Sequence, residues 1–201
     1  MNPSQLITKI EQFVIALVLA GIWPSSARAQ GEHSHLAPND QHPMTAAEPS
    51  NAATLIKVVR DATERFKDPS VAEAEGYALQ FGCVTGPDYG AMGLHYVNGA
   101  LVAGGVIDPK HPQIVIYEPT ADGGLRLTGA DFLVLAEAWN ATHAHAPELM
   151  GQLFQFFDAP NRFGLPPFYT LHVWAWKENP NGAFVNWHPK VSCAAFSGAT
   201  Q

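Results

Sequence analysis

The sequence lacks the short motifs that mark the common enzyme classes. It contains no GxSxG, HExxH, CxxC or GxGxxG segment and no Walker lysine loop. Each of these motifs holds a nucleophile, a zinc pair, a redox pair or a phosphate cradle in a fixed local geometry. Hydrolase, dinucleotide-binding and nucleotide-binding functions are therefore disfavoured. No serine or cysteine is convincingly placed as a nucleophile, which also disfavours acyl-enzyme chemistry.

Basic residues are scarce. The chain has 11 Lys and Arg against 18 Asp and Glu, a formal net charge of −7. Proteins that bind phosphate backbones do so through clustered Lys and Arg, which displace counterions. No such cluster is present in the sequence. Nucleic acid is therefore not expected as a partner.

The sequence also lacks an apolar run long enough to span a bilayer, which needs about 20 residues. Lys9 precedes a short apolar run over 13–22, and Ala-Arg-Ala at 27–29 fits a small-x-small cleavage site. Residues 1–29 are therefore predicted to be a secretory signal peptide, with no lipoprotein cysteine after it. The remaining chain carries 9 − 17 = −8 charges. We expect an exported protein, periplasmic or secreted, with no membrane span after cleavage.

Only two cysteines are present, Cys83 and Cys193. An even count in an exported protein favours a disulfide over two free metal-binding thiols. A closed loop of about 110 residues would restrict the unfolded chain by roughly 4 to 5 kcal/mol in the loop-entropy model. The sequence thus predicts a bond that staples the end of the chain to its first candidate strand.

The chain is expected to have one folded domain. Residues 30–51 contain His33, His35 and His42 but little to bury, so they are predicted to form a mobile leader. The leader histidines follow no fixed ligand spacing. Residues 52–201 are then a single domain, in line with the usual domain size of roughly 100 to 200 residues.

The patterns in this domain predict an α+β fold. Apolar residues at helical spacing over 55–66 predict an amphipathic helix. Strands at 114–118 and 125–135 predict a hairpin, and Asn98-Gly99 predicts another between 94–97 and 100–103. A helix is predicted from Pro147 to about Phe157. The expected core is an antiparallel sheet or a small barrel-like β structure with flanking helices.

The segment from Phe168 to Trp176 is the strongest indication of a site. In an extended chain its side chains alternate, so His172, Trp174 and Trp176 share one face. This pattern predicts a histidine in an aromatic-walled pocket, which Tyr96 would also line. A row of aromatic residues more often supplies core area, so both interpretations stay open.

Three residues on predicted strands are candidate metal ligands: His95, Glu118 and His172. Two imidazoles and a carboxylate can occupy one face of a zinc, copper or iron ion and leave positions open for a substrate. A metal-free alternative uses His172 as a general base oriented by Glu118, with Tyr96 as the acid. In a purely structural alternative, both histidines are hydrogen-bonded core residues and Glu118 is exposed to solvent at the end of a strand.

Three further histidines are weaker candidates. His143 and His145 would share a face on a strand but not on a helix. His188 precedes a proline, which suggests an exposed loop, although its position beside Trp187 and near Cys193 keeps it as a possible additional ligand.

The chain resembles a family of small exported bacterial proteins with no assigned activity. The resemblance is carried by four segments, FGCVTGPDYGAMGLHYVNG, PQIVIYEP, LMGQLF and FYTLHVWAWKENPNGAFVNWHPKVSC. The HYVN, YEP and LHVWAW patterns of the family fall on His95, Glu118 and His172, which implies that these three act together. Relatives often carry Asn at the position of His188, which weighs against it as a ligand.

The sequence therefore supports two kinds of function. The first is an exported metal-binding protein, which as a metalloenzyme would act on a small organic molecule through a site of two histidines and one carboxylate. The second is a non-catalytic envelope or extracellular domain that binds a small apolar ligand or a partner protein through an aromatic pocket. The sequence leaves the metal, the reaction and the oligomeric state open.

Overall fold

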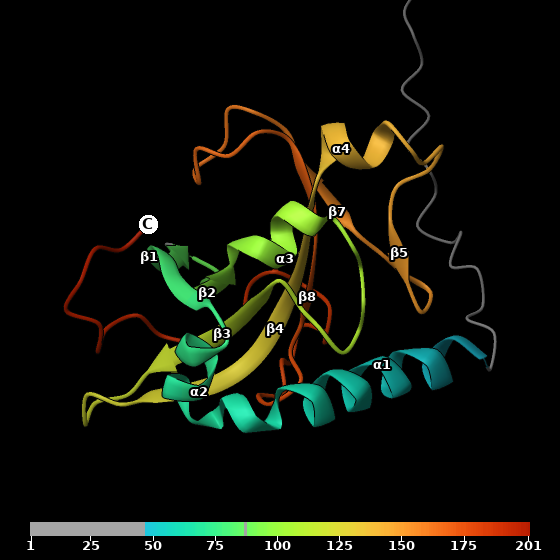
Figure 1. Ribbon diagram of the computed structural model, residues 1–201. Helices are drawn as coiled ribbons and strands as arrows, with labels where there is room; N and C mark the ends of the chain where they lie inside the picture. Colours follow the sequence, from blue (N-terminus) through green and yellow to red (C-terminus); the bar gives the residue numbers. More distant parts are fainter. Residues whose placement is uncertain (1–46, 87) are drawn as a thin grey trace, which may run out of the picture. The chain divides into compact units, whose positions relative to one another are not determined.

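The computed structural model describes residues 47–86 and 88–201, whose arrangement is shown in Figure 1. The predicted signal peptide at 1–29 and the leader as far as residue 46 lie outside the described residues. The first helix, α1 (Ala47–Thr63), begins five residues before the expected domain start at 52.

One face of α1 packs on the sheet. Leu55 and Val59 are fully buried, as their four-residue spacing predicts, and they belong to a core cluster with Phe132 and Leu171. A short 3-10 helix, η1 (Glu64–Lys67), and a helix, α2 (Pro69–Ala74), continue the layer. The helices thus cover the sheet face that carries Phe132 and Leu171.

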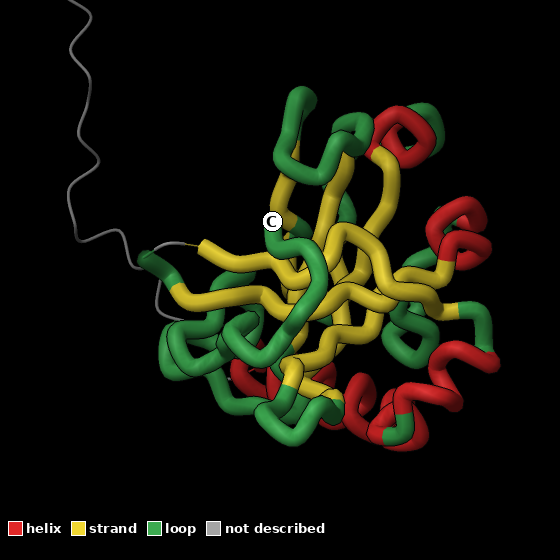
Figure 2. Tube along the Cα trace, turned by 90° about the vertical axis from the view of Figure 1, so that its left-hand side faces the viewer, coloured by secondary structure: helices red, strands yellow, loops and turns green. Residues whose placement is uncertain are grey.

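Six strands form one antiparallel sheet in the order β1-β2-β3-β4-β8-β7. Figure 2 shows that these strands curl strongly. The α+β class and the predicted hairpin over 114–135 are confirmed, the hairpin being β3 and β4. The strands are β1 (Tyr77–Gly86), β2 (Gly90–Asn98), β3 (Ile114–Pro119), β4 (Leu125–Leu135), β7 (Gln155–Phe157) and β8 (Phe168–Val173).

The strand predicted at 100–103 is wrong, because these residues belong to a helix, α3 (Gly99–Gly104). The side-chain oxygen of Asn98 accepts hydrogen bonds from the backbone N–H groups of Ala100 and Leu101. Asparagine before glycine favours a two-residue hairpin turn, but asparagine is also a preferred helix N-cap. Here the capping role prevails.

The helix predicted over 147–157 is also wrong. After a short helix, α4 (Ala136–Asn140), the chain forms a two-stranded hairpin of β5 (Glu148–Leu149) and β6 (Gln152–Leu153). Met150 and Gly151 between them have positive φ values of 50° and 83°, which a right-handed helix does not allow. The four-residue spacing of apolar residues in this segment therefore does not reflect a helix.

The predicted disulfide between Cys83 and Cys193 is present and joins residues 110 positions apart. The end of the chain also pairs with β1, since the N–H of Cys83 donates to the carbonyl of Ala199 and the N–H of Gln201 donates to the carbonyl of Cys83. The disulfide and these hydrogen bonds fasten the irregular C-terminal segment to β1. Among the described residues, no helix combines the length and the apolar character that a bilayer crossing requires.

Candidate metal centre

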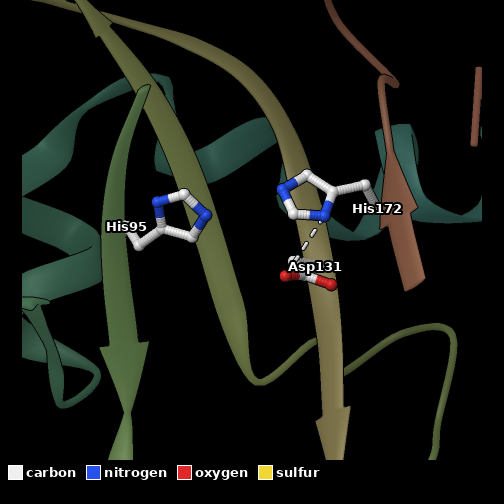
Figure 3. A group of neighbouring side chains, drawn as sticks. All are labelled: His95, Asp131 and His172. Carbon is white, nitrogen blue, oxygen red and sulfur yellow. Dashed lines mark ion pairs between the residues drawn. The ribbon is translucent and has the colours of Figure 1, made fainter. Parts of the chain in front are cut away.

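Three strands bring two histidines and one aspartate together on the concave side of the sheet. His95 lies on β2, Asp131 on β4 and His172 on β8 (Figure 3). Asp131 and His172 are direct partners across the β4–β8 ladder. In a flat sheet β2 and β8 would lie about 14 Å apart, three strand spacings, yet the two imidazole centroids are 5.6 Å apart. The curl of the sheet therefore creates the group.

The three side chains are buried and close enough to share an ion. Their relative exposures are 3 to 4%, and one ligand atom from each lies within 4.8 Å of the others. No other group of this kind occurs among the residues that the structure describes. Zinc bonds of about 2.0 to 2.2 Å separate ligand atoms by about 3.5 Å in a tetrahedral site. A shared ion therefore requires the three groups to close by on the order of 1 Å.

Hydrogen bonds orient two of the three groups. Thr170 Oγ1 donates to Asp131 Oδ1 at 2.6 Å, which leaves Oδ2 for another partner. His95 Nδ1 lies 3.2 Å from the carbonyl oxygen of Gly93, so Nδ1 is the donor in this contact and Nε2 remains available. Contacts of this sort commonly fix the tautomer and the direction of metal ligands.

Gly93 can provide this carbonyl only as glycine. Its φ of 98° lies in the region that favours glycine, and a Cβ at this position would stand 2.5 Å from the carbonyl oxygen of Tyr117. Any side chain would therefore be strained and would collide with β3. The close approach of β2 and β3 at Gly93 is part of what positions His95.

His172 has no such partner. Both of its ring nitrogens are buried and have no hydrogen-bond partner among the described residues, and Nδ1 lies 3.4 Å from Asp131 Oδ2, which is an ion pair only when the imidazole is protonated. A buried polar atom without a partner costs about 1 to 3 kcal/mol. Native proteins rarely retain such atoms without a reason. Binding a metal through one nitrogen would remove part of this cost, so the residues present fit a metal ion.

The electrostatics of the site favour a cation. Burial lowers the pKa of His95 to about 4, with a smaller effect from His172, and it lowers the pKa of His172 to about 3. Burial raises the pKa of Asp131 to about 6, against the hydrogen bond from Thr170. At pH 7 the site therefore holds two neutral imidazoles and one carboxylate. No Lys or Arg is among the described residues that line the adjoining cavity, so the buried negative charge lacks a protein counterion.

A cavity of about 30 Å³ adjoins the three groups. A single water needs on the order of 10 to 15 Å³ by the same measure, so the cavity has room for about two. Phenyl rings dominate its walls, and Phe163 packs edge-on against both Phe81 and Phe168. The main apolar lining residues are Phe81, Met92, Leu133, Phe157, Phe163 and Phe168. An aromatic pocket beside a histidine is therefore present, built by residues other than those that the sequence suggested.

The structure does not bring Glu118, the carboxylate expected from the sequence, together with the two histidines. Its Oε2 lies 2.7 Å from Lys177 Nζ, and its Oε1 accepts a hydrogen bond from the N–H of Ser192. A half-buried lysine thus satisfies this buried carboxylate. Glu118 fastens the end of β3 to the C-terminal segment, and Asp131 occupies the place expected for it.

Tyr96 does not line the cavity. It follows His95 on β2, so its side chain points to the opposite face of the sheet. There its ring packs against that of Tyr117, with centroids 5.0 Å apart. Neither the acid role nor the pocket role expected for Tyr96 is compatible with this placement.

Trp174 and Trp176 do not line the cavity either. β8 ends at Val173, so the expected alternation of side chains does not continue past it. The Trp174 ring does lie beside that of His172, with centroids 6.0 Å apart, and it packs more closely against His188 at 4.8 Å. Trp176 Nε1 donates to Thr63 Oγ1. Both tryptophans contribute to the core.

Three further candidate histidines, His143, His145 and His188, also lie outside the group. His188 is fully buried, and the exposed loop predicted for it is wrong. Its Nδ1 accepts a hydrogen bond from the N–H of Lys190, and its Nε2 lies 3.0 Å from the carbonyl oxygen of Glu178. Both ring nitrogens of His188 are therefore engaged with backbone groups. His143 and His145 are exposed.

Asp131 is the site residue that sequence patterns identify least well. It is a carboxylate within the strand LRLTGADFLVL, where a strand-end position in water and a buried partner are both possible. No family model matches the chain, and none of the curated proteins or solved structures compared with it is significantly similar. The assignment of the site therefore depends on its geometry and chemistry alone.

Proposed function

We propose that the protein binds one divalent transition metal ion through His95, Asp131 and His172, and that it is a metalloenzyme acting on a small molecule in the adjoining cavity. The observation that carries the proposal is a buried carboxylate beside two buried imidazoles, one of which has no hydrogen-bond partner for either nitrogen among the described residues. His95 would bind through Nε2 and Asp131 through Oδ2, because their other polar atoms are engaged.

Two histidines and one carboxylate leave coordination positions open. Bound there, zinc, iron(II) or copper would supply Lewis-acid or redox chemistry. The chain itself contributes orientation through Thr170 and Gly93, and a cavity whose walls are mostly phenyl rings. We further infer that the protein works outside the cytoplasm, because a disulfide such as Cys83–Cys193 persists in oxidising compartments.

A metal-free Asp–His pair is the competing interpretation, supported by the 3.4 Å separation of Asp131 Oδ2 and His172 Nδ1. A general base works best when its pKa lies near the working pH. Burial holds the pKa of His172 at about 3, far below that range. The same lowered pKa keeps the imidazole neutral, which is the form that binds metals.

Elemental analysis of the purified protein tests the proposal. Wild type, His172→Ala, Asp131→Asn and Glu118→Gln would be compared, with His33, His35 and His42 replaced by alanine in every protein. We expect about one metal ion per chain in the wild type and a loss of at least tenfold in His172→Ala and Asp131→Asn, because each removes a ligand. Glu118→Gln is the matched control, and its metal content should equal that of the wild type.

Two results would contradict this assignment. Wild-type protein that stays metal-free after reconstitution with zinc, copper and iron(II) would rule out a metal centre. Loss of metal in Glu118→Gln but not in Asp131→Asn would move the carboxylate ligand to Glu118.

A further inference from the structure

The cavity wall contains a polar side chain that has no role in the candidate metal site described above. Asn186 lies in the C-terminal segment, is 9% exposed, and lines the same cavity as His95, Asp131 and His172. Its Oδ1 is buried and has no hydrogen-bond partner in the part of the chain that the structure describes. Thr170, the other polar neighbour in the wall, is already engaged with Asp131.

The amide of Asn186 is held in one orientation. Its Nδ2 donates to Gln155 Oε1 at 2.7 Å, so the nitrogen side is satisfied and the oxygen side is left without a partner. A leucine, which branches at the same carbon, would occupy the position without a buried orphan acceptor. Because such an acceptor costs about 1 to 3 kcal/mol, its presence is better explained by binding than by stability.

We propose that Asn186 Oδ1 is a recognition group, which accepts a hydrogen bond from a small ligand that carries an N–H or O–H and is held at the metal centre. This inference rests on the proposed metal site and extends it to the class of ligand. The cavity of about 30 Å³ limits the part of the ligand that enters to a few non-hydrogen atoms.

The charge of the site further restricts the class of ligand that could bind. One carboxylate and a divalent ion leave a single net positive charge, and the phenyl walls offer no other compensation. A neutral or singly negative ligand suits this environment. The metal would hold its donor atom, and Asn186 would select those ligands that carry a hydrogen toward Oδ1.

Cobalt(II)-loaded protein allows a direct test, because its visible absorption bands report the binding of small ligands. Two probes would be titrated, hydroxylamine, which carries hydrogens on nitrogen and oxygen, and azide, which has none. In Asn186→Leu we expect hydroxylamine to bind about tenfold more weakly, the value of one buried hydrogen bond. Azide affinity should change less than twofold.

A buried asparagine with a purely structural role is the control. Asn179 donates to the carbonyl of Trp187 and accepts from the N–H of Asn181, so both ends of its amide are used. Asn179→Leu should lower the thermal stability and leave the ratio of the two affinities unchanged. Metal-free Asn186→Leu should be as stable as the wild type, or more so. If Asn186→Leu does not fold, a second variant is available at the exposed Gln155. Gln155→Leu removes the hydrogen bond that holds the Asn186 amide and should weaken the binding of hydroxylamine severalfold.

The outcomes separate the two levels of the proposal. Cobalt bound by all variants, with hydroxylamine and azide affected equally or not at all by the Asn186 and Gln155 variants, would overturn the role of Asn186 and leave the metal site intact. Failure of the wild type to bind cobalt would overturn both.

Discussion

At the scale of single residues, the hydroxyl of Thr170 allows the orientation of one candidate metal ligand, Asp131, to be tested separately. Within residues 47–86 and 88–201, this hydroxyl has one hydrogen bond, which it donates to Asp131 Oδ1. Replacement by valine keeps the shape but removes this bond. We predict that Thr170→Val lowers the metal affinity of the protein by 10- to 100-fold, the usual effect of losing such a contact. A competition titration against a chelator measures it.

Thr128 offers a matched control for that substitution. It is also a buried strand threonine, but its hydroxyl donates to the carbonyl of Ile116. Thr128→Val should lower the free energy of unfolding by about 1 kcal/mol and leave metal affinity unchanged. An equal loss of affinity in both variants would mean that Thr170 acts only through stability.

The sequence identified His95 and His172 but not their carboxylate partner, for a physical reason. The alternation of side chains along a strand predicts which residues share a face of the sheet. It places Glu118 on the same face as Ile114 and Ile116. It does not state which strands become neighbours. Asp131 meets His172 only because β8 adds to the free side of β4, a long-range pairing that no local pattern contains.

At the scale of secondary structure, α1 is the helix that the apolar spacing of the sequence predicted, although its bounds differ from those expected. Its buried face consists mainly of Leu55 and Val59. We predict that Leu55→Ala lowers the free energy of unfolding by about 2 to 5 kcal/mol, because it leaves a cavity between α1 and the sheet. Urea denaturation measures the change.

Lys57 on the exposed side of α1 provides the comparison for Leu55. Its ion pair with Asp61 is solvent-exposed, so Lys57→Ala should change stability by less than about 0.5 kcal/mol. Similar effects of Lys57→Ala and Leu55→Ala would show that packing on the sheet is not what holds the helix.

The elements that the sequence predicted wrongly share one cause. Asn98 and the segment 147–157 both carry signals that suit two structures, a turn or a cap in the first case and a helix or a hairpin in the second. Their surroundings decide between the two. Phe157 stacks on Phe168 of the neighbouring strand β8 with centroids 5.0 Å apart, a contact that favours the extended form over local helix propensity.

At the scale of the whole molecule, the disulfide is the longest-range covalent restraint. It closes a loop of 110 residues between β1 and the C-terminal segment. We predict that Cys83→Ser combined with Cys193→Ser lowers the free energy of unfolding by about 4 kcal/mol, because the unfolded chain gains the freedom of the opened loop. Urea denaturation of oxidised and variant protein tests this value, and a change below about 1 kcal/mol would contradict it.

The candidate ligands are separated by long stretches of chain, with His95 and Asp131 131 − 95 = 36 residues apart and Asp131 and His172 172 − 131 = 41 apart. An unfolded chain would have to close two large loops to gather them. A metal ion would therefore bind the folded protein and ignore the unfolded one, adding about 2.7 kcal/mol of stability at a hundredfold excess over its dissociation constant. Proteases attack the opened chain in proportion to its population. The supply of metal around the protein would then govern its lifetime as well as its chemistry.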